Sequence, residues 1–310
     1  MNSAAVIHRK AYRYRLRSLP GATDRTLRRW EGCCRKVWNL ALAEQQRLRA
    51  IGGKHAGYVA MAKWLTAWRA GAETAYLSDV PVHVLQNVLR ALDTAFQRFF
   101  QKSGGYPKFK RYGETCGLRE TDVKCFSVDV ANGRIRFPKL GWLRYRCSRY
   151  VEGIPKSATL RLEADGWYVS IQVEIGLASP PVPDATAIGA ADRGITNFLA
   201  TDRGQLVVPL HAHRNSLFRL RRYQRACARK IEAAKVAAGV PKDQPFPKGF
   251  RLQPSNRLRQ AQARVARMHQ KIARQRADFL HKLSSELADQ HAVFCSEDLK
   301  MQNMTASAGG

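Results

Sequence analysis

The chain has 310 residues, 45% hydrophobic and 25% charged, which suits two or three folded domains with a sizeable core. Lys and Arg outnumber Asp and Glu by 53 to 24, giving a net charge of +29. Such a surplus repels itself unless a polyanion offsets it, so nucleic acid is the favoured partner and an anionic membrane the weaker alternative.

The apolar segments and the cysteines indicate the compartment. No apolar run approaches the ~20 residues that span a bilayer, and the N-terminus has no hydrophobic signal core. The cysteines are odd in number, include no C-x-x-C pair and mostly lie in apolar patterns, which is typical of small buried side chains. We expect a protein of the reducing cytoplasm, near the nucleoid, with no disulfide framework and no zinc ligands. The cysteines are Cys33, Cys34, Cys116, Cys125, Cys147, Cys227 and Cys295.

The N-terminal segment 8–19 alternates basic and apolar residues, the period of a strand with one basic face. Pro20 and Gly21 end this strand. From Asp24 the apolar spacing changes to steps of three and four, which predicts a helix capped by Thr23 or Asp24. Its stripe consists of Leu27, Trp30, Cys34, Val37, Ala41 and Leu48.

Two further helices are expected before residue 103. Tyr58 and Trp68 mark the limits of one apolar stripe, and the next helix opens at Pro81, because proline is favoured at a first helical position. We interpret the aromatic residues of these stripes as helix packing. Residues 22–103 are therefore predicted to form a small helical domain.

The segment 126–175 has the alternating pattern of β-strands. Asn132-Gly133 and Asp165-Gly166 suit tight hairpin turns. Several short strands at this spacing indicate a barrel or a small antiparallel sheet. The strand at 8–19 has no β partner nearby, so we predict that it joins this sheet and that the helices are an insertion. One face of the last strand consists of Trp167, Val169, Ile171, Val173 and Ile175.

The loop before this sheet mixes aromatic residues with cations. Such a mixture suits both base stacking and phosphate contact, and a plain basic loop is an equal alternative. The residues are Tyr106, Phe109 and Tyr112 among Lys108, Lys110 and Arg111.

A proline-rich linker at 177–186 leads to a second domain. Residues 186–209 read as three short strands separated by turns, and two basic helices follow, the first from about Asn215. A buried strand, HAVFCSEDLK, comes last. Cations cover so many turns of both helices that we predict a phosphate-binding surface rather than a merely solvated one. Its candidate residues are Arg221, Arg222, Arg264, Arg267 and Arg274.

Two carboxylates stand at strand ends in this second domain. Asp192 follows one apolar strand and Glu297 another, whereas Asp298 should face the opposite side. Parallel neighbouring strands would bring Asp192 and Glu297 to one end of a sheet, where α/β sites lie. Carboxylate oxygens bind hard cations, and two Mg²⁺ about 4 Å apart promote phosphodiester cleavage. Such a site needs at least three acidic ligands, and no third is obvious before residue 310.

Three other features have simpler interpretations. His211 and His213 are spaced like metal ligands, but a polar loop after a strand suits them better. His281 has the helical spacing of a packing residue or a phosphate contact. The pair Cys33-Cys34 is predicted to be buried in a helix.

A family resemblance rests on an ordered set of motifs. AADRGITNFLATDRG and VFCSEDLKMQNMTASA resemble the first and second RuvC motifs of the TnpB family, the OrfB proteins of bacterial insertion sequences, which are compact relatives of type V CRISPR effectors. The likeness extends over nearly the whole chain. Further matching segments are AYRYRLRSLP, HVLQNVLRALDTAFQRFF, YPKFKR, RIRFPKLGWLRYR, GWYVSIQVEI and RADFLHKLSSELA.

The resemblance implies an α/β multidomain fold. Residues 1–21 and 104–178 would form a β-barrel wedge domain, 22–103 an inserted helical recognition domain, and 179–310 an RNase-H-like (RuvC) nuclease domain. Asp192 matches the family's first catalytic aspartate and Glu297 its catalytic glutamate.

The match also shows two departures. Ala190-Ala191 replaces the family's common Gly-Ile, a mild change between small residues. The family's zinc ribbon and last catalytic aspartate lie beyond residue 310, so this resemblance implies an incomplete nuclease domain.

Three functions remain open at this point. The first is a Mg²⁺-dependent, RNA-guided endonuclease of a transposon, with guide RNA and double-stranded target DNA as partners. The second is a cleavage-deficient, RNA-guided DNA-binding protein or remnant. An RNA-packaging or ribosomal protein would explain the charge but not Asp192 with Glu297.

Overall fold

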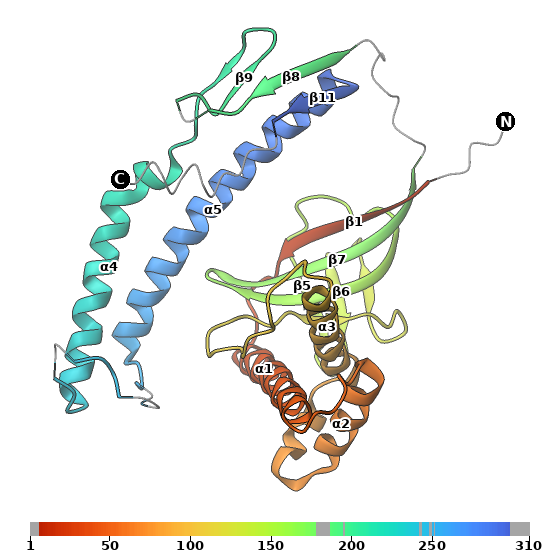
Figure 1. Ribbon diagram of the computed structural model, residues 1–310, viewed down its shortest axis with the longest axis vertical. Coiled ribbons are helices and arrows are strands. Elements are labelled where there is room, and N and C mark those ends of the chain that lie inside the picture. Colours follow the sequence, from red (N-terminus) through yellow and green to blue (C-terminus); the bar gives the residue numbers. More distant parts are fainter. Residues whose placement is uncertain are drawn as a thin grey trace. The chain divides into compact units, whose positions relative to one another are not determined.

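The computed structural model describes residues 6–177, 187–194, 196–241, 244–247, 250 and 252–297. The chain divides into two compact units, Met1–Ala178 and Ser179–Gly310. We call them unit 1 and unit 2 (Figure 1).

Unit 1 is built on a four-stranded antiparallel sheet in the order β1-β7-β6-β2. β1 pairs with β7 along its whole length, so the N-terminal strand joins the later strands as predicted. The residues of β7 from Trp167 to Ile175 that share one face are all buried, because their period of two matches the pleat. The strands are β1 (Val6–Arg15), β2 (Leu118–Glu120), β6 (Ile154–Glu163) and β7 (Gly166–Leu177).

A second, three-stranded sheet consists of β3 (Ser127–Asp129), β4 (Arg134–Phe137) and β5 (Gly141–Arg144). An isolated bridge between Leu16 and Tyr145 connects it to the end of β1. The predicted barrel is therefore not closed within the described residues: β1 extends from one sheet to the other, and β2 pairs with β6 but not with β3.

Both predicted hairpins are present, with small shifts. Between β3 and β4 the chain turns at Gly133, which has a φ of 57°, and Asp129 accepts a hydrogen bond from the backbone of Asn132 (3.1 Å). The turn between β6 and β7 is formed by Ala164 and Asp165, because Gly166 already pairs with Glu163.

Three α-helices and a 3₁₀ helix lie between β1 and β2, in agreement with the predicted insertion. They are α1 (Gly21–Ala50), α2 (Tyr58–Ala70), η1 (Ala72–Asp79) and α3 (Val82–Phe100). Pro20 and Pro81 are the N-caps of α1 and α3. The predicted cap at Thr23 or Asp24 is wrong: the Asp24 carboxylate instead accepts hydrogen bonds from Arg28 (2.7 Å) and from the Trp167 indole (2.9 Å), which links α1 to β7.

Unit 2 contains a four-stranded sheet in the order β10-β9-β8-β11. Three short antiparallel strands follow one another, as predicted, and β11 pairs with β8 in parallel. The strands are β8 (Ile188–Asp192), β9 (Leu199–Thr201), β10 (Leu206–Val207) and β11 (Val293–Ser296). β11 was predicted to be buried, but Val293, Cys295 and Ser296 are exposed and Phe294 is only half-buried.

Two long helices, α4 (Ala212–Ala237) and α5 (Asn256–Gln290), connect β10 to β11 and lie side by side (Figure 1). Leu220 of α4 packs with Met268 and Ile272 of α5. α4 begins three residues before the predicted start at Asn215. The predicted stripe of α5 is buried near its start and only half-buried from Phe279 onward.

The described helices include none that is long and apolar enough to cross a membrane. All seven cysteines are free. Burial is less general than the sequence suggests: Cys33, Cys34 and Cys116 are buried, whereas Cys147 and Cys295 are exposed.

Candidate functional site

The two predicted carboxylates lie at the ends of paired strands. In the parallel ladder of β8 and β11, the last residue pair is Ala191 with Ser296. Asp192 is the next residue of β8 and Glu297 is the residue that follows β11, so the register leads directly to this pair. The parallel pairing expected from the sequence is therefore present.

The residues that precede the two carboxylates share one face of the sheet, because Ala190 pairs with Cys295. Asp192 follows Ala190 by two positions and so lies on this face, and Glu297 is the first residue after β11. Asp192 and Glu297 are both exposed, and on the opposite face Gly189 lies directly beneath the buried ring of His291. The two acidic residues are therefore accessible to a large substrate.

Arg193 connects the two strand ends. Its Nη2 donates a hydrogen bond to the main-chain carbonyl of Glu297, while its Nε is buried with no hydrogen-bond partner among the described residues. This bond holds the backbone that presents the Glu297 carboxylate beside the strand that presents Asp192.

The donor chemistry of this pair suits a hard divalent cation, because carboxylate oxygens are the ligands that Mg²⁺ prefers. A two-metal site would need further acidic ligands besides these two carboxylates. Among the described residues, a close group of three potential metal-ligating side chains lies around His83 in unit 1, and not at Asp192 and Glu297. Asp298 lies outside the described residues.

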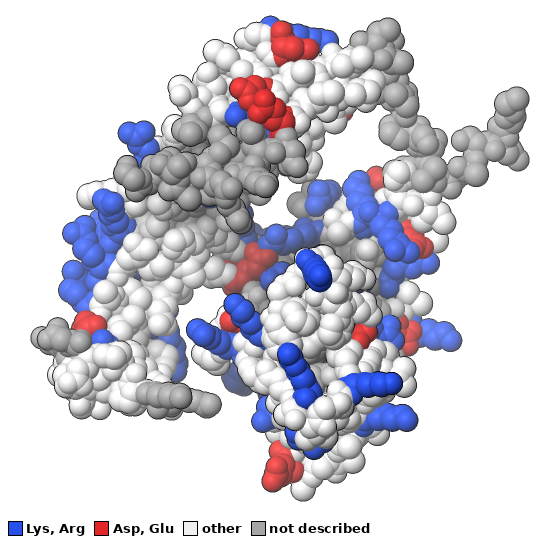
Figure 2. Space-filling model, viewed as in Figure 1, with Lys and Arg blue, Asp and Glu red and all other residues white. Residues whose placement is uncertain are grey.

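The predicted nucleic-acid-binding cations of unit 2 lie on the long helices. α4 carries eight cations and one acidic residue, Glu232, and the first 22 residues of α5 carry seven cations and no acid. Figure 2 shows Lys and Arg side chains along the outer side of α4 and over unit 1. All five predicted residues of these helices are exposed: Arg221, Arg222, Arg264, Arg267 and Arg274.

The basic loop of unit 1 is fastened to α1. The backbone of Lys110 exchanges two hydrogen bonds with Asn39 (2.8 and 3.0 Å), and the Lys108 carbonyl accepts one from Trp38 (3.0 Å). Lys108 and Arg111 are exposed, whereas Lys110 is half-buried with its ammonium 4.5 Å from the Trp38 ring centroid. The loop therefore presents its outer cations on a fixed backbone.

The aromatic residues of this loop divide into two groups. Tyr106 packs edge-on against Phe96 and Phe99, which is a structural role. Phe109 is 45% exposed and Tyr112 97% exposed, although the Arg35 guanidinium lies over the Tyr112 ring, 5.6 Å from its centroid, so both rings can be reached by bases.

The histidines that the sequence offers as candidate ligands lie in or beside helices α4 and α5. His211 is the N-cap residue of α4 and His213 lies in its first turn, so the predicted polar loop is wrong at His213. His281 lies on the exposed side of α5, where its Nδ1 is 3.3 Å from the Ser285 hydroxyl. Neither arrangement is a metal site.

Sequence reasoning missed a second cluster of metal-ligating side chains. His83, Asp122 and Cys125 come together in unit 1, although 39 to 42 positions separate the histidine from the other two. The only signal in the sequence is the D-x-x-C spacing of Asp122 and Cys125, which says nothing about a partner on a distant helix.

The fold and the site define a basic α/β protein with two acidic residues at the edge of a mixed sheet. Residues 169–308 match a family model described as "Probable transposase", OrfB_IS605, and residues 8–54 match one described as a helix-turn-helix domain. In the structure, residues 8–54 contain β1 and the single helix α1 rather than two helices around a turn.

Two curated proteins match almost the whole chain. "Putative RNA-guided DNA endonuclease InsQ" of Escherichia coli (strain K12) is 34% identical over 97% of this chain and 69% of its own length. "Putative RNA-guided DNA endonuclease" of Streptomyces pristinaespiralis is 32% identical over 90% of this chain and 64% of its own length. The chain belongs to the TnpB (OrfB) family, and it spans about two thirds of these relatives.

Among solved structures, the chain resembles one described as "Cryo-EM structure of the Cas12f1-sgRNA-target DNA complex". The TM-score is 0.50 at 10% identity, covering 91% of this chain and 66% of that chain. At this identity the likeness concerns the fold alone.

Proposed function

We propose that this chain is the guide-RNA-binding and nuclease-bearing part of a transposon-associated, RNA-guided DNA endonuclease. The observation that supports the proposal is the parallel pairing of β8 with β11, whose last pair, Ala191 with Ser296, is followed in each strand by an exposed acidic residue, Asp192 and Glu297. The sheet order β10-β9-β8-β11, with one parallel and two antiparallel pairings, suits an RNase-H-like (RuvC) nuclease domain.

Asp192 and Glu297 are the residues that would hold Mg²⁺ in this proposal. When bound, Mg²⁺ would activate the attacking water and stabilise the leaving oxygen of the phosphodiester. The carboxylates reach the substrate because both are exposed. Arg193 acts through the backbone, since it fixes the main chain at Glu297.

Each part of the chain has a role in this proposal. Residues 1–21 and 104–178 form the wedge domain, 22–103 the helical recognition domain, and 179–310 the nuclease domain. Guide RNA and double-stranded target DNA bind through the cations of the 108–111 loop and of α4 and α5. The excess of eight cations over one acid on α4 favours phosphate binding over a solvated face.

The experiment uses the purified chain with its co-purified RNA, matched double-stranded DNA and Mg²⁺. We expect cleavage that Asp192→Asn and Glu297→Gln reduce at least 100-fold while DNA binding stays within about twofold. Ala190→Ser, on the same face, is the matched control and should keep activity. Cleavage by Asp192→Asn at the parental rate would contradict the assignment of Asp192 to the nuclease site.

A cleavage-deficient DNA-binding protein is the second candidate, because the described residues offer two carboxylates at this edge where a two-metal site needs at least three. In that case the parent binds matched DNA with its RNA and leaves it uncut. Purification without any defined RNA would contradict both candidates.

A further inference from the structure

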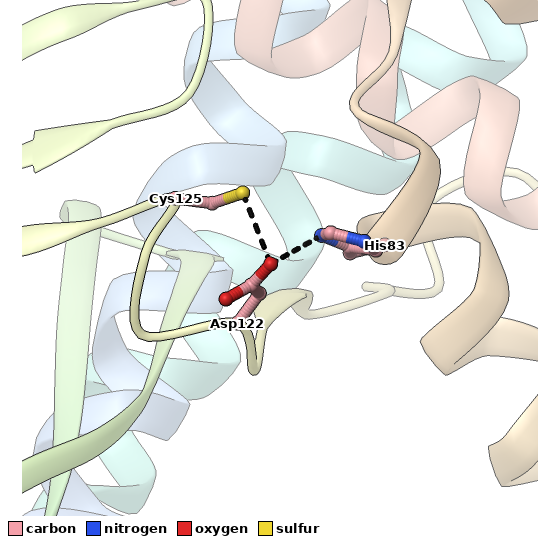
Figure 3. Close-up of side chains that lie close together, drawn as sticks. All are labelled: His83, Asp122 and Cys125. Atoms are coloured by element: carbon pink, nitrogen blue, oxygen red, sulfur yellow. Dashed lines mark hydrogen bonds and ion pairs between the residues drawn. The ribbon is translucent and has the colours of Figure 1, made fainter.

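The cluster of His83, Asp122 and Cys125 lies between a helix and a loop of unit 1. His83 is in the first turn of α3, and the other two residues follow β2. Asp122 is in the centre: its Oδ2 is 3.9 Å from His83 Nδ1 and 3.4 Å from Cys125 Sγ (Figure 3). All three ligand atoms lie within 4.8 Å of one another.

These spacings are close to those of a tetrahedral metal site. Zinc bonds to nitrogen and oxygen are ~2.1 Å long and those to sulfur ~2.3 Å, so the ligands of a tetrahedral ion lie roughly 3.4 to 3.7 Å apart. The two distances from Asp122 Oδ2, 3.9 Å and 3.4 Å, lie near this range, and all three ligand atoms are within 4.8 Å of one another. Three protein ligands leave a fourth position for water.

A buried carboxylate beside the cluster is a second, independent observation that points to a cation-binding site. Glu120 is 0% exposed, and its Oε1 lies 3.3 Å from His83 Nδ1 while accepting hydrogen bonds from the backbone of Thr121 and Asp122 (both 3.0 Å). Its Oε2 is buried and has no hydrogen-bond partner among the described residues. An uncompensated buried carboxylate oxygen is costly, and a nearby divalent cation offsets that cost.

The loop that carries two of the ligands is already held in place. Asn87 of α3 donates hydrogen bonds to the Arg119 carbonyl (3.1 Å) and the Thr121 hydroxyl (3.2 Å), and Asp122 Oδ1 accepts one from the backbone of Lys124 (2.9 Å). An ion would therefore meet a preorganised site, which reduces the ordering cost of binding.

Two other interpretations of the cluster fit less well. A Cys–His nucleophile requires the thiol to donate to the imidazole, but Cys125 donates to Asp122. A simple ion pair of His83 with Glu120 uses neither the thiol nor the second carboxylate oxygen. A sulfur donor disfavours Mg²⁺ and, with imidazole and carboxylate, favours zinc or a similar transition metal.

We propose that unit 1 binds one zinc-class divalent cation through His83, Asp122 and Cys125, with Glu120 supplying additional negative charge beside His83. The ion would link the start of α3 to the turn after β2, and so stabilise the packing of the inserted helices against the sheet. This site is separate from the acidic edge of unit 2 and does not depend on the proposed nuclease function.

Cobalt titration of the full 310-residue chain tests the proposal. After removal of metals with a chelator, Co²⁺ should produce the near-ultraviolet thiolate-to-cobalt absorption at one equivalent, and Zn²⁺ should abolish it. Cys125→Ser should lose this absorption, whereas Cys147→Ser, at an exposed cysteine, should retain it. No absorption in the parent, or its persistence in Cys125→Ser, would overturn the proposal.

A thermal measurement separates metal binding from misfolding of a variant. All six tryptophans lie in unit 1, so their fluorescence follows the unfolding of that unit alone. Zn²⁺ at about a hundred times its Kd should raise the Tm of the parent by about 5 °C or more. In Cys125→Ser the metal-free Tm should match the parent and the Zn²⁺ response should vanish. An equal Zn²⁺ response in Cys125→Ser and parent would rule out this site.

Glu120→Gln tests the role of the buried carboxylate. The amide keeps the size of the side chain but removes its charge, so we expect at least tenfold weaker Co²⁺ binding with the same absorption band. Asp192→Asn, in unit 2, should leave cobalt binding unchanged. Unchanged affinity in Glu120→Gln would remove Glu120 from the site.

Discussion

Glu31 of α1 is a charged side chain in the core of unit 1. Only 5% of the residue is exposed, Oε2 lies 3.7 Å from Arg35 Nη1, and Oε1 has no hydrogen-bond partner among the described residues. Burial raises the pKa of Glu31, and the charge of Arg35 opposes this shift without cancelling it. Folding therefore makes the protonated form of this carboxyl more favourable than it is in the unfolded chain.

The sign of the resulting pH dependence follows from this shift. Between the ordinary glutamate value of 4.5 and the raised folded pKa, the native state binds more protons than the unfolded chain. The contribution of Glu31 to stability is thus fully present below about pH 4.5 and is lost as the pH rises through the folded pKa.

Glu31→Gln should therefore stabilise unit 1 at neutral pH. We expect the free energy of unfolding to rise by about 1 kcal/mol at pH 7, because the neutral amide avoids the cost of burying an ionised carboxylate. The difference from the parent should shrink toward zero at pH 4. Urea denaturation followed by tryptophan fluorescence measures both. A variant that is less stable at pH 7 would mean that the Arg35 ion pair outweighs the cost of burial.

At the scale of secondary structure, Gly189 positions the strand that carries Asp192. A Cβ at this residue would lie 2.3 Å from Cδ2 of His291, which is 7% exposed and also contacts the Leu287 carbonyl (3.0 Å). His291 stands between α5 and β11, and the ring packs against Phe294 with centroids 5.4 Å apart. Only glycine allows β8 to approach this ring closely enough to pair with β11.

Gly189→Ala should consequently loosen the β8–β11 pairing by about 1 to 3 kcal/mol, as overpacking does elsewhere. Hydrogen exchange in 187–192 and 292–297 should become faster, and DNA cleavage should fall with it. The double variant Gly189→Ala with His291→Ala should recover part of the protection, because the smaller side chain makes room. Equal exchange in parent and Gly189→Ala would refute this packing argument.

The sequence predicts elements well where the apolar period is long and regular. The period of β1 indicates a strand that must pair with a distant partner, and β7 is that partner. β2 has three residues and η1 has no stripe, so periodicity reveals neither. The predicted barrel does not close within the described residues because β2 pairs with β6 and not with β3, and such long-range pairing depends on tertiary contacts rather than on a local residue pattern.

The candidate site was predictable for a different reason. Asp192 and Glu297 each follow an apolar strand, and parallel pairing then fixes their common edge. Two features of the site were not predictable, because they depend on tertiary contacts. They are the packing of the His291 ring over Gly189 and the hydrogen bond from Arg193 to the main chain of Glu297. The His83 cluster was not predictable for the same reason, because its members lie on a helix and a loop that are far apart in sequence.

For the whole molecule, the net charge of +29 is the dominant property. Each Lys or Arg that neutralises a duplex phosphate releases condensed counterions, and the logarithm of affinity then falls with the logarithm of salt with a slope of about −0.9 per contact. Arginines already paired with carboxylates should contribute less, because their charge is locally balanced. Among such pairs in unit 1 are Arg28 with Asp24, Arg29 with Asp79, and Arg47 with Glu44.

The triple variant Arg257→Gln, Arg264→Gln, Arg267→Gln, at three exposed residues of α5, should make duplex DNA binding less dependent on salt. If all three residues contact phosphates, the slope should become smaller by about 2.7, since each contact contributes about 0.9. The matched control removes the same charge from Arg28, Arg29 and Arg47 and should change the slope by less than 1. Filter binding between 50 and 300 mM KCl measures both slopes. Equal changes in the two triple variants would mean that net charge alone, and not the surface of α5, determines DNA affinity.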